Sequence, residues 1–209
     1  GIARCNPLWR TSYAKCMLTG SLMGGIKIVT DSSADLPAEV ARELDITVIP
    51  LIVTCDERSY EDTSLPRDEF WRLAQEGRVL NTSQPPMGVF EQAFRQLVEQ
   101  GHQVLCATVT GRHSGTFATA WSAAQEFAGR VTVFDSSSLS WGLAGQVIRA
   151  ARLAAQGATL ETILAALHSL RERTHVIALL DSVERLRRSG RAAKLMPAVD
   201  RLAHALNLK

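Results

Sequence analysis

From Ile26 onward, segments typical of β-strands alternate with segments typical of α-helices. The first kind is rich in β-branched residues, and the second carries apolar residues at helical spacing. Predicted strands cover residues 26–30, 46–54, 103–110, 130–136 and 175–182, and predicted helices cover 37–44, 66–77, 89–98, 115–127, 139–156 and 159–173. Pro50 indicates an edge position or a bulge in its strand. The alternation requires right-handed βαβ crossovers, so we predict an α/β fold whose mostly parallel sheet is flanked by helices.

Composition indicates the cellular compartment in which the chain is expected to work. Hydrophobic residues make up 46% of the 209 residues, but no uninterrupted apolar run approaches the ~18 residues that a membrane span needs. The four cysteines, Cys5, Cys16, Cys55 and Cys106, form no CxxC pair, a pattern that favours a reducing compartment over a disulfide framework. We therefore expect a cytoplasmic protein without stable membrane insertion.

Residues 1–25 differ from the rest of the chain. They contain three basic residues, Arg4, Arg10 and Lys15, no acidic residue and no periodicity. We interpret them as a disordered arm or a non-native leader, because a secretion signal would need a continuous apolar segment. Without their charges the net charge of +2 falls to about −1, so the remaining chain is not generally basic and nucleic-acid binding is not expected.

Two hydroxyl clusters precede predicted helices, in the stretches VLNTSQPPMGVF (79–90) and GRHSGTFATA (111–120). A parallel sheet binds ligands at the carboxyl ends of its strands, and the start of a helix offers unpaired N–H groups to an anion. If the two helix starts face each other, they form a cradle of uncharged donors for one small anion. The candidate ligand-binding residues are Thr82, Ser83, Ser114, Gly115 and Thr116.

Other interpretations of these clusters stay open. Serine and threonine are common N-caps, so either cluster can serve capping alone. The spacing does not distinguish a carboxylate from a phosphate. The chain has no GxxxxGK[ST] or GxGxxG pattern, which argues against a nucleotide cofactor, and we expect none.

An alternative is a serine-dependent acyl hydrolase or transferase that uses Ser114. His113 is adjacent to Ser114, but neighbouring side chains diverge, and GRHSG is not the GxSxG of a nucleophile elbow. None of the other histidines has a spacing that marks it as the base or as a metal ligand. Basic residues also gather in ERLRRSGRAAK (184–194), as a solvated helix face or as a docking surface for an acidic partner.

Several stretches together resemble the DegV family, in that family's order and roughly its spacing. They are VTDSSADLP (29–37), NTSQPPMGVFEQAF (81–94), TGRHSGTFATAWSAA (110–124), VTVFDSSSLSWGLAG (131–145), LLDSVERLRRSGRAAK (179–194) and LNLK (206–209). The paired motifs TSQP and SGT are the most specific of these.

The resemblance implies a bacterial protein of two α/β domains that holds a long-chain fatty acid between them. It presents the acid to a separate ATP-dependent fatty acid kinase for phospholipid synthesis and performs no catalysis itself. Thr82 and Ser114 would hold the carboxylate, and Arg191, in SGR where the family usually has GGR, is the candidate for partner docking.

The chain departs from the family pattern in two ways. It stops at LNLK, where the family's second domain normally continues, so we expect a first domain over 26–158 and only part of a second, smaller domain over 159–209. Arg112 and His113 also stand where small residues are more usual. A further alternative is therefore a relative that binds no lipid and has only an interaction role.

Overall fold

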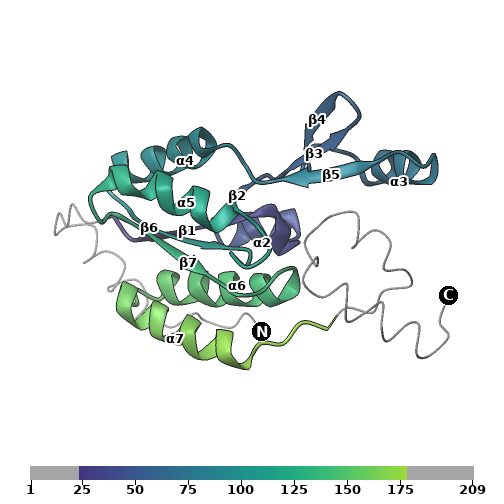
Figure 1. The fold of residues 1–209 in the computed structure, drawn as a ribbon. Helices are drawn as coiled ribbons and strands as arrows, with labels where there is room; N and C mark the ends of the chain where they lie inside the picture. Colours follow the sequence, from purple (N-terminus) through teal and green to yellow (C-terminus); the bar gives the residue numbers. More distant parts are fainter. Residues whose placement is uncertain (1–23, 178–209) are drawn as a thin grey trace, which may run out of the picture.

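A four-stranded parallel sheet forms the centre of the computed structural model, which describes residues 24–177 (Figure 1). Its strands are β1 (Ile26–Asp31), β2 (Ile46–Ile49), β6 (Gln103–Thr108) and β7 (Val131–Asp135). They lie in the order β2-β1-β6-β7, and every neighbouring pair is parallel. The predicted α/β class is confirmed.

Helices cover both faces of this sheet. The helices are α2 (Ala38–Glu43), α4 (Met87–Glu99), α5 (Thr116–Ala124), α6 (Trp141–Ala155) and α7 (Leu160–Arg173), with short 3-10 turns η1 (Ser32–Ala34) and η2 (Gln125–Phe127). One hydrophobic cluster joins α4 and α5 to one sheet face, and the other joins α2, α6 and α7 to the opposite face. Side chains of successive strand residues point to opposite faces, which is why Ile28 enters one cluster and Val29 the other.

The helix α7 packs in the first domain. Ile163 and Leu167 are fully buried and share a cluster with Leu143 and Val147 of α6. The sequence prediction placed residues 159–173 in the second domain, whereas these residues complete the core of the first. Residues 178–209 lie outside the described part of the chain, and so does most of the predicted strand 175–182, whose residues 175–177 are not in a strand.

Residues 50–84 form an arm that projects from the α/β body (Figure 1). The arm holds β3 (Ile52–Cys55), β4 (Arg58–Glu61), α3 (Arg67–Gln75) and β5 (Leu80–Ser83). Its three strands form a separate antiparallel sheet in the order β4-β3-β5. The predicted single strand 46–54 was wrong, because the chain leaves the parallel sheet at Pro50 and starts a second sheet at Ile52.

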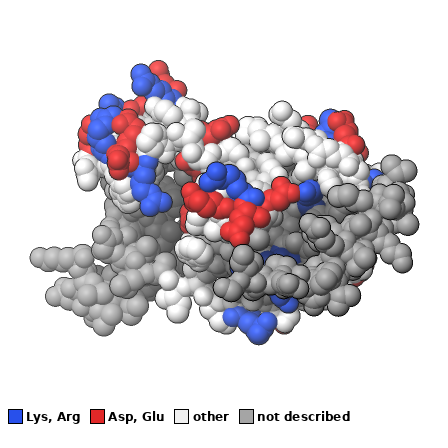
Figure 2. Space-filling model, turned by 180° about the vertical axis from the view of Figure 1, so that it is seen from behind, with Lys and Arg blue, Asp and Glu red and all other residues white. Residues whose placement is uncertain are grey.

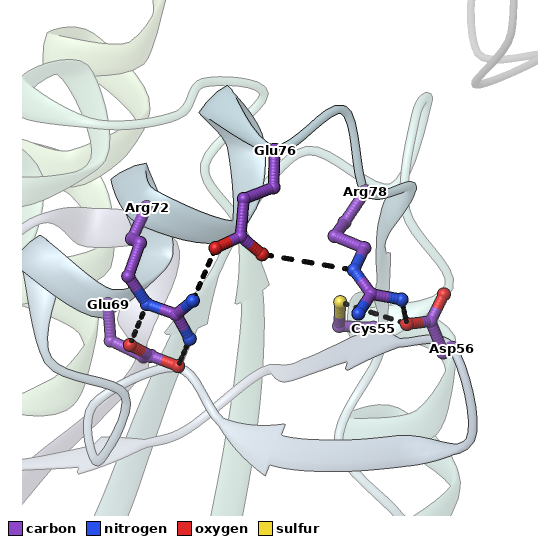
Figure 3. Close-up of polar contacts among 6 residues, drawn as sticks. All are labelled: Cys55, Asp56, Glu69, Arg72, Glu76 and Arg78. Atoms are coloured by element: carbon purple, nitrogen blue, oxygen red, sulfur yellow. Dashed lines mark hydrogen bonds and ion pairs between the residues drawn. The ribbon is translucent and has the colours of Figure 1, made fainter.

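A chain of ion pairs links α3 to the turn between β3 and β4 (Figure 3). Arg72 pairs with Glu69 at 2.6 Å and with Glu76. Arg78 then pairs with Asp56 of the turn at 2.6 Å. Acidic and basic side chains are interspersed over the arm (Figure 2). Because each pair is half-exposed, salt screens it, and the chain of pairs positions the turn more than it stabilises the fold.

We expect Arg78→Gln to speed amide exchange in the turn at Asp56 and Glu57, because it removes the contact between that turn and the end of α3. The effect should shrink in 1 M salt, where the Debye length falls to about 3 Å. Hydrogen exchange with mass spectrometry measures it. Arg58→Gln is the matched control, since Arg58 has no ion pair within residues 24–177. Equal exchange in the two variants would contradict this role.

Candidate functional site

The carboxyl edge of the parallel sheet contains the point where the chain reverses its winding. From β1 the chain continues to β2 on one side, and it later returns to β6 on the other side of β1. Adjacent crossovers then leave in opposite directions, and this arrangement opens a crevice beyond the carboxyl ends of the two strands. The loops after β1 and β6 therefore form the walls of the candidate site.

Asp31, the last residue of β1, joins these two loops. Its carboxylate accepts hydrogen bonds from the backbone N–H of Val109 at 2.7 Å and from the backbone N–H of Ser33 at 3.1 Å. The Ser33 hydroxyl donates to the same carboxylate. Asp31 is fully buried, so these bonds satisfy a group that would be costly to leave unpaired. The sequence analysis did not single out Asp31, although it lies in the stretch VTDSSADLP.

Burial raises the pKa of Asp31 above its ordinary value of 3.8, and the hydrogen bonds from Ser33 and Val109 oppose the shift. Burial also raises the pKa of Asp62 in the arm, against a hydrogen bond from the Ser32 hydroxyl. That bond is 2.5 Å long, and Ser32 Oγ also accepts the backbone N–H of Leu51 at 2.9 Å. The loop after β1 thus holds the base of the arm as well as the loop after β6.

The second hydroxyl cluster lies where the sequence predicted it, at the start of α5. Gly115 is the N-cap residue and has no side chain with which to cap the helix. Ser114 Oγ accepts the backbone N–H of Thr116 at 3.3 Å and lies 2.8 Å from Thr116 Oγ1. Thr116 is fully buried and Ser114 partly exposed. When Thr116 Oγ1 donates to Ser114, the hydrogen of the Ser114 hydroxyl is available to a ligand.

Contrary to the prediction, the first hydroxyl cluster lies in a strand and not at the start of a helix. Thr82 and Ser83 are the last two residues of β5, and α4 begins at Met87 after the N-cap Pro86. Thr82 pairs with Val53 and Ser83 with Ile52. Residues opposite each other in an antiparallel pair point to the same face, so Thr82 lies on the face of Val53 and Ser83 on the other. The structure therefore separates these two side chains.

A large pocket of about 940 Å³ lies on the Val53 side of the arm. Its apolar lining includes Val53, Leu65, Phe70, Trp71 and Trp141. Trp71 and Trp141 are 53% and 65% exposed, and their gathering in one pocket is typical of an apolar surface that a ligand or another surface covers. Pairing with Val53 places Thr82 on the face that borders this pocket.

Gln84 joins the two clusters, and the sequence analysis missed it. Its Nε2 donates to Thr119 Oγ1 of α5 at 2.8 Å, and its side-chain amide occupies the space where a Cβ on Gly115 would lie. Gly115 has an ordinary right-handed conformation, so the missing side chain matters for this close approach and not for its backbone angles, and a larger residue would displace the Gln84 amide. The motif TSQP contained the signal, but its partner lies 35 residues further along the chain.

The contacts of Ser114 give no support to the hydrolase alternative. Within residues 24–177, no histidine side chain is hydrogen-bonded to Ser114: His102 contacts Gly25, and His168 contacts Arg171. The same residues contain no group of three metal-ligating side chains and no helix that is long and apolar enough to cross a membrane. Arg191 and His204 lie outside the described residues, so the docking role of Arg191 stays a prediction.

We expect Asp31→Asn to lower the free energy of unfolding by about 1–3 kcal/mol. The amide nitrogen of asparagine cannot accept a hydrogen bond, so one of the N–H groups that now donate to the carboxylate would lose its acceptor. The raised pKa means that the folded state holds the proton more tightly. The stabilisation that this proton gives the fold is full below pH 3.8 and is lost as the pH rises through the folded-state pKa of Asp31. The stability difference between wild type and Asp31→Asn should therefore shrink with rising pH.

Chemical denaturation across the acidic range measures this difference. Asp45→Asn is the matched control, since Asp45 is an exposed surface carboxylate, and its stability should stay within about 0.5 kcal/mol of wild type. A difference for Asp31→Asn that grew as the pH rose would contradict the dominant effect of burial.

Comparison with known proteins identifies relatives of the whole described fold. The family described as "uncharacterised protein, DegV family" matches residues 25–209. A DegV domain-containing protein of Streptococcus pneumoniae is 38% identical over 175 residues, which are 83% of this chain and 63% of the relative. A second one, from Lactococcus lactis, is 36% identical over 81% of this chain and 62% of its own length.

Solved structures give the same result. A fatty-acid-binding DegV family protein from Thermus thermophilus superposes with a TM-score of 0.74 at 37% identity, over 81% of this chain and 61% of that protein. DegV of Bacillus subtilis, a fatty-acid-binding protein, gives 0.75 at 25% identity, over 84% and 64%. The chain thus spans less than two thirds of the length of these relatives. The family model, the sequence relatives and the solved structures all agree, so this chain belongs to the DegV family.

Proposed function

We propose that this chain binds a long-chain fatty acid and presents its carboxyl group to a separate ATP-dependent fatty acid kinase. The observation that carries the proposal is the pairing of Thr82 with Val53, which sets a hydroxyl of the TSQP motif on the face of the arm that borders the large pocket and its apolar walls. The fatty-acid binding of the Thermus thermophilus and Bacillus subtilis relatives supports it. A solved relative from Eubacterium ventriosum, 30% identical, binds stearic acid.

The acyl tail supplies most of the binding energy in this proposal. Burial contributes about 0.8 kcal/mol per methylene, so a chain of 16 to 18 carbons gains on the order of 10 kcal/mol before entropic costs. The pocket of about 940 Å³ has room for such a chain, and Phe70, Trp71 and Trp141 offer flat apolar walls. The charged side chains of the lining, Asp35, Asp62 and Arg67, carry both signs, so the apolar walls and not a net charge make this pocket the place for the tail.

The head group is held by uncharged donors. Thr82 and Ser114 each offer a hydroxyl, and Gly115 and Thr116 lie beside Ser114 at the start of α5. Ser83 is on the other face of β5, so any support from it is indirect. A hydrogen bond to a charged carboxylate contributes about 1.5–3 kcal/mol. Such donors orient the carboxylate without the ion pair that a lysine or arginine would make, and this leaves the oxygens reactive toward a phosphoryl group on the kinase. Arg191 is the proposed contact with that kinase.

Removing both hydroxyls, by Thr82→Val and Ser114→Ala, should weaken binding of oleic acid by about a hundredfold, because each of the two lost hydrogen bonds is equivalent to about a factor of ten. The protein as purified should then carry less fatty acid, and acyl phosphate formation with the purified kinase should fall. Denaturing extraction with mass spectrometry measures the load, and ligand displacement measures the affinity.

Thr54→Val is the matched control for these substitutions. Thr54 follows Val53 in β3 and points to the opposite face of the arm, where its hydroxyl contacts Ser59 at 3.3 Å. Its loss should leave the affinity for oleic acid unchanged. A double variant that stayed fully loaded and supported acyl phosphate formation at the wild-type rate would disprove the assigned head-group site.

A further inference from the structure

The arm that carries Thr82 is attached to the parallel sheet without any strand pairing. The strand β5 pairs with β3 of the arm, and the parallel sheet contains neither of them. Ser114, by contrast, lies in the loop between β6 and α5, which belongs to the body of the fold. The β-ladders therefore do not determine the separation between the Thr82 and Ser114 hydroxyls, and another contact has to fix it.

Gln84 makes a contact of this kind, from the segment directly after β5. Its Nε2 donates to Thr119 Oγ1 at 2.8 Å, and its amide packs against Gly115 so closely that a Cβ there would collide with it. The backbone N–H of Thr119 donates to the Gly115 carbonyl at 3.0 Å, as the first helical hydrogen bond of α5. Gln84 thus holds both ends of the first turn of α5, immediately beside Ser114.

We propose that Gln84, through its bond to Thr119, is a positioning residue that sets the distance between the Thr82 and Ser114 hydroxyls and thereby selects for a carboxylate head group. This inference rests on the proposed function. A carboxylate is a rigid, compact acceptor, and two donors bind it together only when their positions are fixed within about half an ångström. A ligand with the same tail but a head that needs a single hydrogen bond does not depend on that spacing.

The experiment compares oleic acid with oleyl alcohol, which has the same tail, on the full chain. Thr119→Val removes the acceptor for Gln84 while keeping the shape of the side chain, and Gln84→Ala removes the donor. Both variants should bind oleic acid about tenfold more weakly, as expected for one impaired charge-assisted bond, and should bind oleyl alcohol as wild type does. A merely structural role would weaken both ligands equally.

Two further variants complete the test. Thr119→Ser keeps the hydroxyl and should restore the wild-type preference for the acid. Ser122→Ala changes an exposed hydroxyl one turn further along the same helix and should have no effect. Unchanged affinity for oleic acid in Thr119→Val and Gln84→Ala, or an equal loss for the acid and the alcohol, would overturn the role of Gln84. Wild-type protein that bound neither ligand would instead refute the proposed function, and this inference with it.

Discussion

The buried carboxylate of Asp31 is the interaction on which the arrangement of the site depends. It lies at the carboxyl end of β1 and accepts the backbone N–H of Val109 just beyond β6, so it joins the two loops that form the walls of the candidate site. The same loop carries Ser32, whose hydroxyl holds Leu51 and Asp62 at the base of the arm. Without Asp31, the loop after β1 would lose its side-chain bond to Val109, and Ser32 at the base of the arm would be less firmly positioned.

The arm is therefore held at both of its ends by single polar side chains. Ser32 contacts the start of the arm, and Gln84 contacts α5 just after its last strand. Polar contacts of this kind are directional, so they fix orientation while contributing modestly to stability. In the proposed function, this attachment keeps the Thr82 hydroxyl in reach of Ser114, while the apolar pocket at the arm supplies the binding energy for the tail.

The parallel sheet could be predicted from the sequence because its strands are apolar runs of β-branched residues followed by amphipathic helices. The arm could not. The strand β5 consists of Leu80–Ser83, with three polar residues in four, and it forms only because Ile52–Cys55 lies beside it. The Pro50 signal was visible, but periodicity alone does not reveal that the chain changes sheets there. Likewise, nothing in the sequence marks Asp31, at the end of β1, or Gln84, just after β5, until their partners, 78 and 35 positions away, are known.

The central claim is that uncharged donors from two separate segments hold one carboxylate while an apolar pocket takes the tail. A crystal structure of the full chain with bound oleic acid tests it most directly. We predict that the carboxylate oxygens lie about 2.5–3.0 Å from Thr82 Oγ1 and Ser114 Oγ, with the tail against Phe70 and Trp141. A carboxylate bound elsewhere, or one paired with an arginine or lysine while both hydroxyls face solvent, would contradict the account.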